Sequence, residues 1–192
     1  MDSEFINSPQ TKNTLIATSV SAIICGLMQF EFEWIFWIPG AVFGISFALA
    51  NFHRKFQIGL YIALSSVIYI GAVQIFFKAP GTDLNHPWAG GFLAGTFGAL
   101  ALAVLTKLVS KTSLVLLDEF RSTLIGGMTG VAFVQLFIFG LGEPFSNDIG
   151  KALVLIPVAF AVWQVPVGWL LTTSIQPNSK LSDEFSTKNA PG

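Results

Sequence analysis

Charged residues, cysteine and histidine are all scarce in this chain of 192 residues. Charged residues make up 11% of it, against about 25% in average soluble domains, which leaves too few to cover a soluble surface. A net charge of −1 and the absence of a basic run exclude nucleic acid as a partner, because such binding depends on phosphate contacts. The single cysteine, Cys25, excludes an intramolecular disulfide.

The sequence also lacks the residue patterns of common catalytic chemistries. It has no glycine-rich loop ending in lysine to hold a phosphate, and no His-Glu-x-x-His zinc motif. Its two histidines, His53 and His86, fall on opposite sides of the membrane in the topology predicted from charge, so they cannot share a metal or act together. We therefore expect no enzymatic activity, no metal site and no cofactor.

Long apolar stretches are what the chain does contain. Hydrophobic residues make up 53% of it, and six stretches approach the roughly 20 residues that a helix needs to cross about 30 Å of hydrocarbon. The sequence therefore predicts an all-α, polytopic integral membrane protein whose solvent is the lipid bilayer. The six predicted transmembrane helices are residues 14–30, 34–52, 56–77, 88–106, 123–141 and 152–175. Four of the five tryptophans fall near span ends, as interfacial anchors do, and Trp163 is the exception.

Eight of the ten basic residues fall on one side of the predicted membrane. By the positive-inside rule this side is cytoplasmic, so both termini are predicted to lie in the cytoplasm. We expect the membrane to be a bacterial cytoplasmic (inner) membrane. The eight residues are Lys12, Arg54, Lys55, Lys107, Lys111, Arg121, Lys180 and Lys188, and the two on the other side are Lys78 and Lys151.

The six spans form one predicted domain, residues 1–175. Asp2 and Glu4 precede the first span without a basic region, so a cleavable signal peptide is not expected and this span should be retained. Residues 176–192, rich in Ser, Asn, Lys and Pro, predict a disordered cytoplasmic tail. Residues 113–121 predict either a short interfacial helix or a continuation of a neighbouring span into the cytoplasm.

A weak internal repeat of helical hairpins underlies the six spans. Residues 26–30, 71–75 and 132–136 each read as a small residue, two apolar residues, a glutamine and an apolar residue. The fourth span aligns without gaps on the second when Trp88 is matched to Trp37, and the last span departs from this pattern. The sequence therefore predicts three repeated hairpins, of which the third has diverged.

Small residues recur at every fourth position in the second and fourth spans, and more briefly in the fifth. No hydrophobic drive joins helices in lipid, so close backbone approach supplies their packing. We therefore predict that these residues face other helices, the alternative being that they line a substrate pathway. They are Gly40, Gly44 and Ala48, then Gly91, Gly95 and Ala99, and finally Gly126 and Gly130.

Polar side chains inside spans are costly, so they indicate a candidate site. Gln29, Gln74 and Gln135 recur at matching depths and would converge if the hairpins packed around a pseudo-threefold axis. With Glu31 and Gln164 they predict an outward-facing polar pocket for a small ligand. Hydrogen bonding of the amides between helices is the alternative, with Glu31 solvated at the surface.

Two prolines interrupt the last span on either side of Gln164. Pro157 and Pro166 free backbone carbonyls, which are tolerated only where protein or water satisfies them. This pattern is typical of an irregular, cavity-lining helix, although a kink filled by neighbouring hydroxyls accounts for it equally well.

Two functions fit these features. The glutamines and prolines favour a small-molecule or lipid binding and transport component, whereas the glycine stripes favour a non-catalytic accessory or assembly subunit of a membrane complex. The expected partners are lipid, a small-molecule ligand, and other membrane subunits or a second copy of the chain. A polar cavity open to one side would favour the first function, and a filled bundle with an exposed apolar patch the second.

Overall fold

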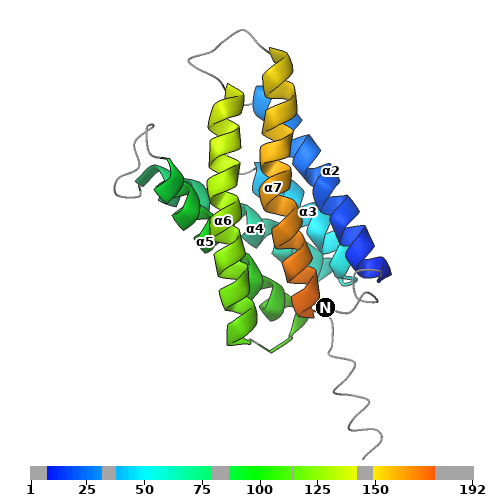
Figure 1. The fold of residues 1–192 in the computed structure, drawn as a ribbon. Coiled ribbons are helices and arrows are strands. Elements are labelled where there is room, and N and C mark those ends of the chain that lie inside the picture. The colour runs from blue at the N-terminus through cyan, green and yellow to red at the C-terminus, as the bar shows by residue number, and fades with distance from the viewer. Residues whose placement is uncertain (1–7, 32–37, 79–86, 114, 142–148, 176–192) are drawn as a thin grey trace, which may run out of the picture.

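The computed structural model describes residues 8–31, 38–78, 87–113, 115–141 and 149–175. These residues form six α-helices and, within the described ranges, no strand (Figure 1). The all-α prediction is therefore confirmed, as expected where lipid requires each segment to satisfy its own backbone hydrogen bonds. The helices are α2 (Pro9–Glu31), α3 (Ile38–Asn51), α4 (Lys55–Lys78), α5 (Trp88–Ser110), α6 (Leu116–Leu141) and α7 (Ile149–Ile175).

Five of these helices, all except α3, are long and apolar enough to cross a membrane. The chain is thus a multi-pass integral membrane protein. The helix α3 has 14 residues, which gives a length of about 21 Å at 1.5 Å per residue, short of the roughly 30 Å hydrocarbon core. Part of the predicted second span, residues 34–37, lies outside the described residues, so the sixth crossing stays a prediction.

The helices are arranged as a ring. Each helix from α2 to α6 packs against the next one along the chain, and α7 closes the ring on α2 while also contacting α5 and α3. The start of α2 and the end of α7 lie at one end of the bundle, here named the basal end, and α2 ends at the opposite, distal end (Figure 1). Because α5 packs on α6 as well as on α4, the ring does not separate into three hairpins, and the repeat stays a prediction.

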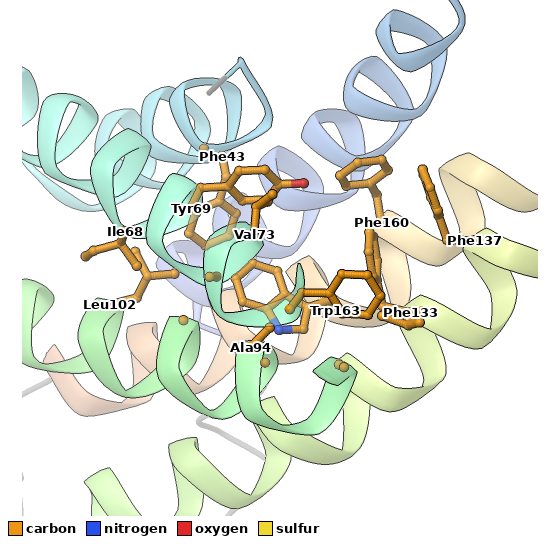
Figure 2. A pocket seen from close by; sticks show the side chains of 18 of the residues that line it. Phe43, Ile68, Tyr69, Val73, Ala94, Leu102, Phe133, Phe137, Phe160 and Trp163 are labelled. Atoms are coloured by element: carbon orange, nitrogen blue, oxygen red, sulfur yellow. The ribbon is translucent and has the colours of Figure 1, made fainter. Parts of the chain in front are cut away.

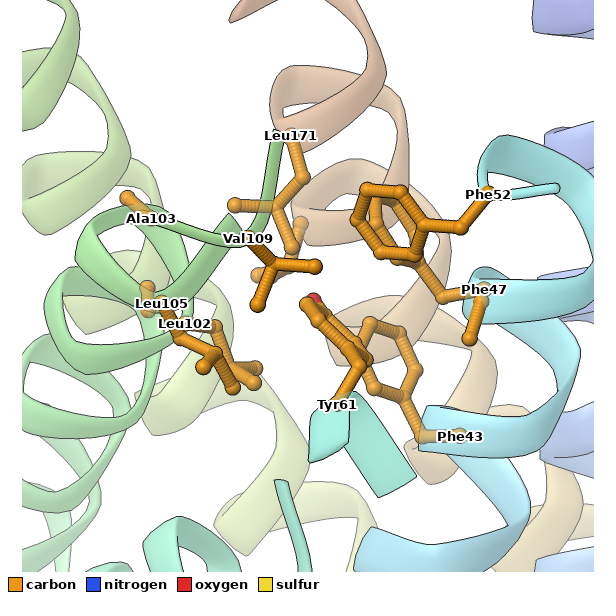
Figure 3. Close-up of a cluster of buried hydrophobic side chains, with 12 residues drawn as sticks. Phe43, Phe47, Phe52, Tyr61, Leu102, Ala103, Leu105, Val109 and Leu171 are labelled. Atoms are coloured by element: carbon orange, nitrogen blue, oxygen red, sulfur yellow. The ribbon is translucent and has the colours of Figure 1, made fainter. Parts of the chain in front are cut away.

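Aromatic and aliphatic side chains fill the basal half of the bundle (Figure 3). The rings of Phe47 and Tyr61 stack with centroids 5.1 Å apart, and the Tyr61 hydroxyl lies 3.0 Å from the hydroxyl of Thr106. The buried cluster consists of Phe43, Phe47, Ala48, Phe52, Tyr61, Ala99, Leu102, Ala103, Leu105, Val109, Val167 and Leu171. This half of the bundle is a packed core.

Polar contacts join the helices at the basal end. The Asn51 amide donates to the Thr14 hydroxyl at 3.0 Å, and the Gln10 amide donates to the Asn51 side-chain oxygen at 3.1 Å, which ties α3 to α2. The buried ammonium of Lys107 in α5 lies 2.9 Å from a carboxylate oxygen of Glu119 in α6. Since α6 begins at Leu116, the segment around Glu119 continues the fifth span rather than forming a separate interfacial helix.

Small residues occupy the helix contacts. A Cβ atom added to Gly95 would lie 2.8 Å from the Gly130 Cα, and one added to Gly91 would lie 2.9 Å from the Gly130 carbonyl oxygen. Gly126 faces the Ala99 side chain at the same crossing of α5 and α6. The α3 stripe faces α4, where a Cβ atom on Gly40 would lie 2.6 Å from the Tyr69 Cβ, one on Gly44 would meet Ser65, and Ala48 is fully buried. Each crossing brings backbones closer than a larger side chain would allow.

Candidate functional site

The distal half of the bundle contains a cavity of about 290 Å³. Among the described residues the backbone of α4 packs directly on neither α6 nor α7, so only side chains reach across the interior between them. Small side chains on the walls, including Ala72 of α4 and Ala94 and Gly98 of α5, leave this space unfilled. The lining residues come from α3, α4, α5, α6 and α7.

Aromatic rings form much of the cavity wall (Figure 2). Phe133 of α6 meets Phe160 of α7 edge to face with centroids 5.1 Å apart, and it stacks on Phe137 at 5.6 Å. On another side Phe43 of α3 lies 6.1 Å from the Trp163 ring of α7. Such rings offer large apolar contact surfaces with little conformational freedom to lose.

The cavity reaches the surface near the distal end of α4. Phe77 lines the cavity and is itself 65% exposed, and its neighbour Phe76 also contributes to the wall. The two rings meet edge to face with centroids 5.2 Å apart. The wall of the cavity therefore continues to the protein surface at this pair.

Few polar atoms face the cavity. The Ser65 hydroxyl contacts two backbone carbonyl oxygens, those of Gly40 at 3.0 Å and Ile62 at 2.9 Å. No described residue accepts a hydrogen bond from the Tyr69 hydroxyl or the Trp163 indole N–H. None of the lining residues carries a charge, and the described part of the chain holds no group of three side chains suited to a metal ion. The arrangement suits a neutral, apolar molecule.

The predicted glutamine site and the cavity do not coincide. Gln74 and Gln135 are exposed on α4 and α6, whereas Gln164 is buried. The Gln164 amide nitrogen lies 3.5 Å from the Cys25 sulfur of α2, so this side chain belongs to the contact between α2 and α7. The side chains of Gln29 and Glu31 lie outside the described residues. A shared polar pocket of these amides therefore stays a prediction, and the three described amides have different surroundings.

Sequence reasoning did not find the cavity, although one signal for it was present. Trp163 is the tryptophan that lies away from the predicted span ends, and Tyr69 is one of only two tyrosines in the chain. Both side chains combine an apolar body with a polar tip, which normally favours the membrane interface. Their position inside predicted spans is therefore unusual, and both side chains line the cavity.

No family model, curated protein or solved structure matches this chain. The functional argument therefore rests on the fold and on the chemistry of the cavity.

Proposed function

We propose that this protein binds a neutral, apolar small molecule or lipid chain inside its helical bundle, as a binding or transport component of the membrane. The observation that carries the proposal is the cavity of about 290 Å³ with an almost entirely apolar lining. Its volume falls near the lower end of the roughly 300–1,000 Å³ that small-molecule pockets occupy. An occupant of this size is a compact ring system or a short stretch of acyl chain.

Energetics favour an occupied cavity. The walls of an empty apolar cavity lose the dispersion contacts that a neighbour would supply. Leucine deletions in a soluble protein core put this loss at about 24 cal/mol per Å³ of enclosed cavity, so leaving even part of this space empty would cost on the order of 1 kcal/mol or more. A bound apolar molecule restores those contacts and stabilises the bundle by the same order.

The two ends of the bundle differ in a way that fits one-sided access. The basal half is filled by the aromatic core around Tyr61 and joined by the Lys107–Glu119 pair, whereas the cavity reaches the surface near Phe77 in the distal half. The charge asymmetry supports a basal end in the cytoplasm. We therefore place the opening toward the outer leaflet.

The accessory-subunit alternative predicts a bundle without internal space. The cavity favours ligand binding over that alternative, but its apolar lining changes the expected class of ligand from polar to apolar. Other subunits or a second copy of the chain remain compatible with ligand binding, since the outer faces of the helices carry many exposed apolar side chains.

Filling the cavity tests the proposal. The Ala94→Leu substitution adds a branched side chain to the cavity wall, and Ala63→Leu places the same change on an exposed face of α4. Each protein is purified in mild detergent, extracted with organic solvent and analysed by mass spectrometry. We expect an apolar molecule to copurify with the wild-type protein and with Ala63→Leu, and to be lost from Ala94→Leu.

Two results would contradict the proposal. One is a folded wild-type protein that carries nothing beyond detergent. The other is the same bound molecules in equal amounts in all three proteins, because those molecules would then coat the outer surface rather than fill the cavity.

A further inference from the structure

Two hydrogen-bond donors on the cavity wall have no acceptor in the described part of the protein. They are the Tyr69 hydroxyl of α4 and the indole N–H of Trp163 in α7. In Figure 2 the Tyr69 hydroxyl points across the cavity toward the side where Phe160 lies. In the same view the Trp163 nitrogen lies beside Ala94, apart from the Tyr69 hydroxyl, so the two donors face different parts of the cavity.

Leaving such donors unpaired is unfavourable away from water. Buried polar groups normally have a partner, because desolvation without a hydrogen bond costs free energy. Ser65 on the same wall follows this rule, since its hydroxyl contacts the Gly40 and Ile62 carbonyl oxygens. Tyr69 and Trp163, which are both partly buried, have no such partner among the described residues, and a bound molecule with an acceptor atom would supply one.

The residues that line the cavity limit which kinds of acceptor atom can bind there. The indole nitrogen can only donate, so its partner must offer a lone pair. No lining residue is a lysine, arginine or histidine that could neutralise a carboxylate or phosphate, and an unpaired charge would be far costlier to bury than a neutral oxygen. The acceptor is therefore neutral.

We infer that the cavity selects an apolar molecule that carries a neutral oxygen acceptor, such as a ketone, ester or ether, and that this oxygen accepts a hydrogen bond from Tyr69 or from Trp163. This inference rests on the proposed binding function and adds the class of ligand. The apolar walls supply affinity, and the two donors supply orientation and selectivity.

A matched pair of probes separates these two contributions. Tetralin and 1-tetralone share a fused ring system and differ by one ketone oxygen. Saturable binding of each is measured by equilibrium dialysis in detergent, with the cavity-filled Ala94→Leu protein as the background. The variants are Tyr69→Phe, which removes only the hydroxyl, and Trp163→Phe, which removes the N–H. The control is Tyr61→Phe, whose hydroxyl pairs with Thr106 in the basal core.

We expect the variant that removes the donor to this oxygen, Tyr69→Phe or Trp163→Phe, to lower the affinity for 1-tetralone about fivefold relative to that for tetralin, the effect of one neutral hydrogen bond. The quantity compared between each variant and the wild-type protein is the ratio of the 1-tetralone affinity to the tetralin affinity. This ratio cancels differences in how the two probes partition into the micelle. Tyr61→Phe should not alter this ratio.

The experiment distinguishes failure of this inference from failure of the proposed binding function. If both probes bind saturably and neither Tyr69→Phe nor Trp163→Phe changes the ratio, the inference is wrong and the apolar binding site stands. If neither probe binds wild-type protein above the Ala94→Leu background, both the inference and the proposed function are wrong.

Discussion

The Lys107 ammonium lies 2.9 Å from a Glu119 carboxylate oxygen, and this ion pair joins the last turn of α5 to the first turn of α6. The Lys107 side chain is 1% exposed, and the more exposed Asp118 approaches it at 3.5 Å. A cation at the end of a helix and an anion at the start of one both match the helix dipole. The 2.9 Å separation is that of a charge-assisted contact, and the second carboxylate oxygen, Oε2, has no hydrogen-bond partner among the described residues.

We expect Lys107→Met to destabilise the bundle by about 3–5 kcal/mol, because it leaves the Glu119 carboxylate buried without its partner. Thermal unfolding in detergent measures the loss. The control is Lys111→Met, at an exposed lysine one turn later. The double variant Lys107→Met with Glu119→Gln should recover much of the stability. Equal melting temperatures for the two single variants would show that the pair contributes nothing.

Gly95→Leu should prevent the α5–α6 crossing from forming. A Cβ atom there would meet the Gly126 carbonyl and lie 2.8 Å from the Gly130 Cα, and backbone atoms cannot move aside as a flexible side chain can. Gly59→Leu is the matched control, because a Cβ atom at Gly59 has no neighbour within 4 Å. The yield of monodisperse protein in detergent is the readout. Similar yields for the two variants would refute the packing role of this stripe.

The helices themselves could be predicted because lipid allows few alternatives to a continuous apolar helix. Hydropathy predicted the ends of the helices less accurately than their positions. The helix α2 begins at Pro9, before the predicted boundary at Thr14, because Ser8 caps it by accepting a hydrogen bond from the Thr11 N–H at 3.2 Å. Serine followed by proline is typical of a helix start. A search for apolar stretches does not use this signal.

The candidate site could not be predicted from the same pattern. Intramembrane polar residues attract attention because they are costly, yet two of the described glutamines, Gln74 and Gln135, are exposed. The cavity arises instead from the separation of α4 from α6 and α7, which depends on helix tilt and on small wall residues such as Ala94. Apolar wall residues carry no energetic penalty in a membrane, so they do not mark a cavity in the sequence. Trp163 and Tyr69 were the residues that could have indicated it.

The charge asymmetry predicts the orientation of the bundle. We expect a cysteine introduced at His53, exposed between α3 and α4, to react with a membrane-impermeant maleimide only after the cytoplasmic side is opened. A cysteine at Lys78, exposed at the distal end of α4, should react in intact cells. The native Cys25 is fully buried and provides an unreactive background. The reverse labelling pattern would invert the topology and place the cavity in the inner leaflet.

Replacing glutamines with leucine separates the cavity proposal from the predicted glutamine site. Leucine roughly keeps the volume and removes the amide. At Gln164 the change removes one contact to the Cys25 sulfur and a buried oxygen without a partner among the described residues. We therefore expect a stability change below about 1 kcal/mol and no loss of the copurifying apolar molecule.

The exposed side chains of Gln74 and Gln135 should tolerate leucine equally well, because lipid surrounds the outer faces of α4 and α6. Mass spectrometry of the extracted ligand is the readout, and Ala94→Leu is the positive control for its loss. The glutamine site predicts the opposite, since each amide would hold the ligand directly. If any of these leucine variants stays folded and loses the ligand while Ala94→Leu retains it, the binding site is formed by the amides and the apolar cavity is not its location.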